Sequence, residues 1–233
     1  MALVHEVSRR FNVSINIFKA IINGVNVNKF APNSEQRNSV REELNLKEEN
    51  ILVGSVGRLV EVKNYPSLIR AFAIVIQKQP KARLALAGDG PERKLLEALI
   101  EELGLKHKVF LMGRREDVPS VMNAYDIFVL PSFREGLSNT ILEAMSSALP
   151  VVVTNVGGSP EIVIENKTGH LFEVSQSSQL ADLLDSLMTD RKKLQTMSED
   201  ARKHVVENYS LETMVNNYQQ TYRDLLGITK MRA

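Results

Sequence analysis

Short apolar runs alternate with helix-like segments from Ile51 onward, and this alternation is the strongest constraint on the fold. Near-continuous apolar strands joined through helices are typical of a parallel sheet that is covered on both faces. The sequence therefore predicts an α/β fold with a doubly wound, Rossmann-like parallel sheet. The predicted strands are residues 51–56, 83–87, 109–112, 127–130 and 151–154, and the helical patterns that follow them are residues 66–78, 92–103, 118–124, 140–147 and 160–164.

The segments on either side of this alternation have different patterns. Residues 170–174 predict one more short strand, and residues 179–226 then keep helical spacing without a further strand. Near the start, residues 18–22 predict a weak strand, and residues 32–49 form a polar tract. We expect the first fifty residues to be a linker together with the remnant of an upstream part.

Charge and composition exclude several classes of protein. With 29 basic and 28 acidic residues, the net charge of +1 gives no reason to expect a nucleic acid partner. The absence of cysteine removes disulfides, thiolate metal sites and thiol catalysis, and the four histidines lack metal-ligand spacing. The chain has no apolar run of about 18 residues, the length that a membrane span needs. We expect a cytoplasmic protein with no metal and no transmembrane segment.

The segment after the fourth predicted strand is suited to a charged ligand. Glu135 and Glu143 bracket seven residues at a junction between a loop and a helix. The backbone amides of Gly136, Leu137, Ser138, Asn139 and Thr140 are expected to be free there, and unpaired amides at a helix N-terminus attract phosphate. Two acids beside them indicate a ligand that also carries hydroxyl groups. For Glu143 an alternative is open, because residues 140–143 also fit a capping box.

Basic residues follow the first and third predicted strands. Arg58 and Lys63 come after the first strand, where a guanidinium and an ammonium group suit a diphosphate, although a solvated loop is an equal alternative. Gly113 and Arg114 end the third strand and could face a nucleobase, or Arg114 and the next arginine could pair with the acids that follow. Because the carboxyl ends of parallel strands share one edge of a sheet, all these residues are expected to lie near one another.

Two common nucleotide-binding motifs do not fit. The turn of residues 88–91 has two glycines, but Arg93 stands where a dinucleotide-binding loop would have its third glycine. No such loop follows the first strand, and no P-loop motif is present. The sequence thus disfavours both an NAD site and a P-loop.

The ordered set of motifs resembles the C-terminal, donor-binding domain of retaining GT-B glycosyltransferases of family 4. The resemblance covers roughly residues 23–226. Residues 23–25 look like that family's Asn-Gly-Val-Asp linker, with Asn26 in place of the aspartate. The motifs that carry the resemblance are, in order, residues 57–59 with 63–64, 88–91, 113–114, 131–132 with 135–137, the Glu135 and Glu143 pair, 149–152 and 157–158.

The resemblance implies a role for each site residue. Arg58 and Lys63 would neutralise the diphosphate of a UDP- or GDP-linked sugar, assisted by the amides of residues 136–140. Glu135 would contact the transferred sugar, and Glu143 would accept hydrogen bonds from the ribose. Gly113 and Arg114 would flank the base, and the side-chain cations would make a metal or other cofactor unnecessary. Glu135, Arg58 and Lys63 are the residues expected to serve catalysis.

The resemblance also implies a domain organisation. Residues 1–34 would be the remnant of an N-terminal domain and the linker, residues 35–208 the nucleotide-sugar-binding domain, and residues 209–233 a helix that packs back on the N-terminal domain. The chain would bind donor without being catalytically complete, its glycan or lipid-linked acceptor being held by that other domain, which could associate peripherally with a membrane. Bacterial polysaccharide synthesis is the expected setting. The alternatives are a non-transferring nucleotide-sugar-binding module and an epimerase of the same architecture.

Overall fold

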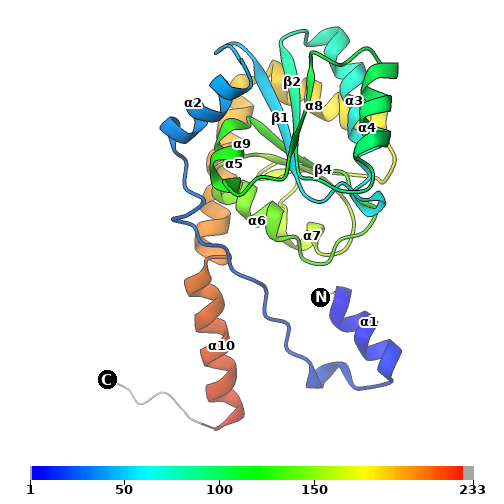
Figure 1. Cartoon of the computed structure of the whole chain (residues 1–233). Helices are drawn as coiled ribbons and strands as arrows, with labels where there is room; N and C mark the ends of the chain where they lie inside the picture. The colour runs from blue at the N-terminus through cyan, green and yellow to red at the C-terminus, as the bar shows by residue number, and fades with distance from the viewer. Residues whose placement is uncertain (1, 228–233) are drawn as a thin grey trace.

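A computed structural model of the chain describes residues 2–227. In this described part, one sheet of six parallel strands has the order β3-β2-β1-β4-β5-β6 (Figure 1). Strands β1 and β4 are neighbours in the middle of the sheet, and the order in which successive strands are added changes direction between them. The prediction of a doubly wound parallel sheet is confirmed. The strands are β1 (Ile51–Val56), β2 (Ala82–Ala87), β3 (Val109–Gly113), β4 (Ile127–Leu130), β5 (Val151–Thr154) and β6 (Gly169–Phe172).

Helices cover both faces of the sheet, because successive strand side chains point to opposite faces and both sets are apolar. One face packs against α3 (Tyr65–Lys78), α4 (Arg93–Glu102) and α8 (Ser177–Thr189). The other packs against α5 (Val118–Ala124), α6 (Asn139–Ser146) and the short α7 (Ser159–Ile162). Helix α9 (Arg191–Asn208) contributes residues to both clusters. This layering confirms the predicted helices and leaves the carboxyl edge of the sheet to its loops.

Two predictions for the first fifty residues are wrong. Residues 18–22 form no strand, because they have no neighbouring strand with which to pair. The polar tract contains a helix, α2 (Ser34–Glu43), whose first turn is capped by the Asn33 side chain. Arg37 and Arg41 of α2 hold it against the sheet, with distances of 2.7 and 3.3 Å to the carboxylate of Asp126, which lies just before β4. These ion pairs help to hold α2 against the domain, a task for which most surface helices use an apolar stripe.

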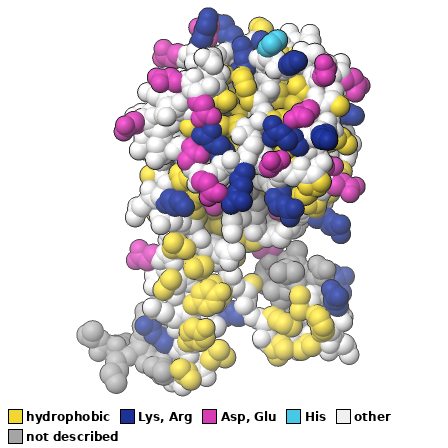
Figure 2. All heavy atoms as spheres, viewed as in Figure 1, with side chains coloured by type: hydrophobic (Ala, Val, Ile, Leu, Met, Phe, Trp, Pro, Cys, Tyr) yellow, Lys and Arg dark blue, Asp and Glu magenta, His cyan; other side chains and the backbone are white. Residues whose placement is uncertain are grey.

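Helix α10 (Leu211–Leu225) runs away from the sheet, as does the N-terminal segment with α1 (Ala2–Phe11) and η1 (Ile15–Ile17) (Figure 1). Helix α10 has no buried residue, and Figure 2 shows hydrophobic side chains along its surface. The exposed apolar side chains repeat at helical spacing: Leu211, Val215, Tyr218, Tyr222 and Leu225. Across the described residues, none of the helices is both long and apolar enough to cross a membrane.

Candidate functional site

Loops from the first three strands meet at the carboxyl edge of the sheet. The N–H of Gly57 donates to the carbonyl of Ala87 at 3.0 Å, and the N–H of Gly88 donates to the carbonyl of Gly113 at 2.8 Å. The loop after β1 thus lies against the loop after β2, which lies against the end of β3. In an open α/β sheet this edge, beside the reversal of strand order, is the usual place for a ligand.

Lys63 and Glu135 are in direct contact at this edge. Lys63 ends the short 3-10 helix η2 (Glu61–Lys63), and its Nζ lies 2.7 Å from Oε1 of Glu135. The Ser132 hydroxyl donates to the same Oε1 at 2.5 Å. The side chains of Lys63 and Glu135 are 20% and 10% exposed, so the pair is partly shielded from water. Two of the three predicted catalytic residues, Lys63 and Glu135, are thus brought together, although the sequence did not reveal their contact.

The two loops that carry this pair are joined by their backbones. The N–H of Phe133 donates to the carbonyl of Val62 at 2.8 Å, and the side-chain amide of Asn64 donates to the carbonyl of Pro131 at 3.2 Å. Asn64 is buried and has a left-handed backbone with φ of 49°. These bonds fix the distance between the loop after β1 and the loop after β4, so the Lys63–Glu135 contact has a rigid support.

Helix α6 begins at Asn139, with Ser138 as its N-cap residue. The Ser138 hydroxyl makes no capping bond and instead lies 2.9 Å from the hydroxyl of Thr140. Within residues 2–227, no hydrogen bond from a backbone N–H of residues 136–140 to a loop, cap or side-chain acceptor is found. Gly136 is exposed and Leu137 half-buried, so the predicted row of free amides is present at this edge.

Glu143 does not take part in a capping box. It is the fifth residue of α6, whereas the capping box requires the third, so this alternative is wrong. No hydrogen-bond partner of its carboxylate lies among the described residues. Burial raises the pKa of Glu143, and the nearby charge of Lys29 opposes that rise in part. A half-buried acid without a partner is a group that a ligand hydroxyl could satisfy.

A cavity of about 410 Å³ lies between the loops after β1, β2 and β3. Arg58 and Arg114 both line it, and both side chains are exposed. Arg114 also lies 2.9 Å from Glu116, so the predicted local pair is present, in a fully solvated setting. In the described part of the chain no contact joins Arg58 to Glu143. The loops therefore gather the predicted residues along one edge without placing all of them in contact.

Arg115 also lines this cavity, which the sequence did not predict. Its guanidinium lies 2.8 Å from Asp117 and 2.5 Å from Glu43. Hydrogen bonds to these two carboxylates raise the pKa of Arg115. The sequence predicted the pairing with Asp117 but not the bond to α2, because Glu43 is distant in the chain. Arg115 thus closes one side of the cavity as a fixed, already compensated charge.

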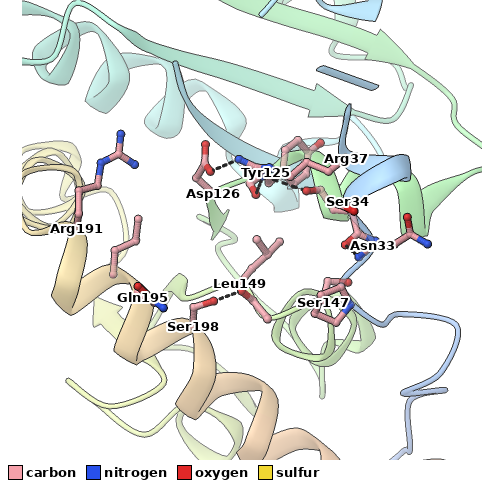
Figure 3. Close-up of a pocket in the computed structure, with 14 residues that line it drawn as sticks. Asn33, Ser34, Arg37, Tyr125, Asp126, Ser147, Leu149, Arg191, Gln195 and Ser198 are labelled. Carbon is pink, nitrogen blue, oxygen red and sulfur yellow. Dashed lines mark hydrogen bonds and ion pairs between the residues drawn. The ribbon is translucent and has the colours of Figure 1, made fainter. Parts of the chain in front are cut away.

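A larger cavity of about 630 Å³ lies at the opposite, amino edge of the sheet (Figure 3). Of the three charged side chains that line it, Arg37 and Asp126 are paired with each other. Arg37 donates to the backbone carbonyls of Asn123, Ala124 and Tyr125 as well as to Asp126. The Asp126 carboxylate also accepts the N–H of Leu52 at 2.7 Å. We interpret this cavity as the seam where α2 is attached, and the smaller cavity at the carboxyl edge as the candidate site.

No cluster of three or more histidine or acidic side chains that could hold a metal ion occurs among the described residues. Positive charge at the carboxyl edge comes from side chains, among them Arg58, Lys63 and the arginines after β3. The expectation that the protein works without metal stays a prediction.

Comparisons with known proteins show which proteins this chain is similar to. The galactosyltransferase of Escherichia coli that is named UDP-Gal:alpha-D-GlcNAc-diphosphoundecaprenol alpha-1,3-galactosyltransferase is 32% identical over 209 residues, which are 88% of this chain and 54% of that protein. N-acetyl-alpha-D-glucosaminyl L-malate synthase of Bacillus anthracis is 30% identical over 80% of this chain and 49% of its own length. The chain spans about half the length of these curated relatives.

Solved structures show the same fold. HepE of Anabaena, in complex with UDP and glucose, matches 90% of this chain and 58% of its own with a TM-score of 0.82 and 28% identity. The C-terminal domain of LpcC, a group 1 glycosyl transferase of Francisella tularensis, is covered completely, with a TM-score of 0.73 and 26% identity over 81% of this chain. The profile of the family described as glycosyl transferases group 1 matches residues 36–204. The chain belongs to the group 1 family of glycosyl transferases.

Proposed function

We propose that this chain is the donor-binding half of a retaining, metal-independent GT-B glycosyltransferase of family 4, one that uses a nucleotide diphosphate sugar. The observation that carries the proposal is the Lys63–Glu135 pair, held 2.7 Å apart beside the free amides at the start of α6. A cation next to free amides suits a diphosphate, and an acid beside them suits a sugar. The binding of UDP and glucose by HepE of Anabaena supports this assignment.

The diphosphate would lie between the side chains of Arg58 and Lys63 and the amides of residues 136–140. When the bond to the sugar breaks, negative charge grows on the departing nucleoside diphosphate. Positive groups that already face the bound diphosphate would stabilise that charge without further reorganisation, which is usually the largest contribution to catalysis of this kind. Lys63 would have to turn from Glu135 toward the phosphates, and the same motion would leave Glu135 to interact with the sugar.

The nucleoside would occupy the neighbouring cavity of about 410 Å³. Gly113 and Arg114 at the end of β3 would lie beside the base. Glu143 would accept hydrogen bonds from the ribose hydroxyls, because its carboxylate is half-buried and unpartnered among the described residues. Burial penalises the ionised form of Glu143, and two hydroxyl donors from a ribose would offset that penalty.

The acceptor would be held by a second, N-terminal domain in a longer protein. We propose that residues 1–34 lead from that domain, that residues 35–208 bind the donor, and that the C-terminal segment of residues 209–233 packs back on it; residue 1 and residues 228–233 of these ranges lie outside the described residues. The exposed apolar stripe along α10 supports such packing, because apolar side chains at helical spacing usually face another layer. The chain alone would then bind donor without transferring sugar.

The names of the relatives support a glycan or lipid-linked acceptor. The Escherichia coli galactosyltransferase is named for a diphosphoundecaprenol-linked substrate, and a Staphylococcus aureus relative is named as a capsular polysaccharide glycosyltransferase. We propose a role in bacterial polysaccharide synthesis at the cytoplasmic face of the membrane, with any membrane contact made through the acceptor domain.

Calorimetric titration of the chain with UDP, GDP, UDP-glucose and GDP-mannose tests the proposal. We expect one nucleotide to bind, and Arg58→Ala to weaken it by about 10- to 100-fold, because one charge-assisted hydrogen bond is lost. Arg70→Ala is the matched control, since Arg70 is an exposed arginine on α3. Failure of all four ligands to bind a folded wild-type chain would contradict the proposal, as would equal weakening by Arg58→Ala and Arg70→Ala.

A further inference from the structure

The Glu135 carboxylate is held by one of its two oxygens. Oε1 accepts from the Ser132 hydroxyl at 2.5 Å and contacts the Lys63 ammonium at 2.7 Å. Among the described residues, Oε2 has no hydrogen-bond partner, and it is not an enclosed atom. One oxygen is therefore anchored and the other is open to a ligand.

Ser132 is itself fixed more firmly than a loop residue usually is. Its side chain is fully buried, with 0% exposure, at the carboxyl end of β4. The hydroxyl of Thr154, at the end of β5, donates to the backbone carbonyl of Ser132 at 2.7 Å, and Thr154 is also buried. A chain of contacts thus runs from β5 through Thr154 and Ser132 to Glu135. The contacts of the Glu135 carboxylate thus reach back to the edge of the sheet.

The two groups on Oε1 differ in what happens when a donor binds. Lys63 carries a positive charge on a flexible stem and would be attracted to an incoming diphosphate. Ser132 cannot follow, because its hydroxyl is enclosed and its backbone is tied to Thr154. Once Lys63 turns to the phosphates, the Ser132 hydroxyl is the donor that remains on Glu135.

We propose that Ser132 is a positioning residue that holds Oε1 of Glu135, so that Oε2 points at the sugar hydroxyls of a bound nucleotide sugar. The inference rests on the proposed donor-binding function and adds a residue to it. Without the Ser132 hydroxyl, the Glu135 carboxylate would be free to rotate once Lys63 has turned to the diphosphate, so that Oε2 would no longer be aimed at the sugar. Loss of the Ser132 hydroxyl should therefore weaken the binding of the sugar part of the donor, because in the proposed site the nucleotide part does not contact Glu135.

The experiment compares the affinities of nucleoside diphosphate and nucleotide sugar, using UDP with UDP-glucose and GDP with GDP-mannose. For Ser132→Ala we expect the affinity for the nucleotide sugar to fall about tenfold, the usual effect of one lost hydrogen bond to a charged group, with the affinity for the bare nucleotide changed less than about twofold. Ser146→Ala is the matched control, because Ser146 is equally buried and its hydroxyl has no partner in the described residues. We expect this control to leave both affinities unchanged.

A crystal structure of the Ser132→Ala chain gives a second readout that does not depend on binding. We expect the Glu135 carboxylate to leave its position while the loops around it stay in place. Equal losses for nucleotide and nucleotide sugar, no loss for either, or an unmoved carboxylate would each overturn the inference. If the wild-type chain binds no nucleotide, the proposed function fails, and the position of the carboxylate still decides whether Ser132 sets it.

Discussion

Gly157 sits where the loop after β5 touches the loop that carries Glu135, and we expect Gly157→Ala to displace that acid. The backbone of Gly157 is left-handed, with φ of 55°, and a Cβ added there would lie 1.8 Å from the carbonyl oxygen of Glu135. The next residue donates from its N–H to the carbonyl of Gly136 at 2.9 Å, so the two loops are bonded at this point. A methyl group would push directly against the backbone of the proposed sugar-binding residue.

The cost can be worked from these distances. Ordinary contacts of a Cβ begin at 3.4 Å, so one or both loops would have to move by about 1.6 Å in total. A non-glycine residue in the left-handed region costs about 1–2 kcal/mol, and overpacking typically adds about 1–3 kcal/mol. We expect Gly157→Ala to lower the free energy of unfolding by about 2–5 kcal/mol. We also expect it to abolish most of the affinity gained from the sugar.

Urea unfolding followed by circular dichroism measures the first effect, and calorimetry with nucleotide and nucleotide sugar measures the second. Gly104→Ala is the matched control, because Gly104 has φ of 67° and a Cβ there would meet no atom within 4 Å. The control should lose only the backbone contribution, about 1–2 kcal/mol, and keep its binding. The reasoning is refuted if Gly157→Ala is no less stable than Gly104→Ala and still binds the sugar.

Three further predictions concern stability. Asp126→Ala should lower the free energy of unfolding by about 3–5 kcal/mol in urea titrations, because it leaves the buried Arg41 with backbone carbonyl acceptors but without a counter-charge, whereas Glu116→Ala on the exposed surface should cost under about 0.5 kcal/mol. Glu143→Gln should be more stable than wild type at pH 8 but not at pH 4. Burial raises the pKa of Glu143 in the folded state, so the wild-type protein loses stability as the pH rises through that pKa, whereas the glutamine stays neutral. A difference in unfolding free energy between variant and wild type that is the same at both pH values would contradict this. Tyr222→Ser on α10 should change the unfolding free energy by under about 0.5 kcal/mol, and a larger loss would mean that this side chain already packs within the domain.

The sheet could be predicted from the sequence because its strands are buried on both faces. Residues 127–130 are a continuous apolar run, residues 51–56 are apolar apart from Gly54 and Ser55, and in the structure every residue of β1 and β4 is buried. The pattern does not give the order of the strands, because all of them have the same apolar character and any of them could occupy the centre. That order decides that the loops after β1 and β4 are neighbours at the carboxyl edge.

Helix α2 could not be predicted from hydrophobic periodicity. Only Val40 and Arg41 of this helix are buried, and most of its other residues are polar or charged. Its attachment comes from arginine contacts to Asp126, more than eighty residues further along the chain, which no local pattern reveals. Helices that are held by ion pairs lack the apolar stripe on which such predictions depend.

The site shows the same limit for charged residues. Lys63 and Glu135 were both predicted from the sequence, yet the sequence does not show that their charges compensate each other through direct contact. In the proposed site, a donor would have to replace this existing interaction of Lys63, and only the difference between the two contacts would add to affinity. Ser132 reduces that cost by keeping a hydrogen bond on Glu135 when Lys63 leaves. A serine three residues before a glutamate does not indicate a positioning role in the sequence. That role depends on Lys63, which the loop after β1 brings to the same carboxylate oxygen.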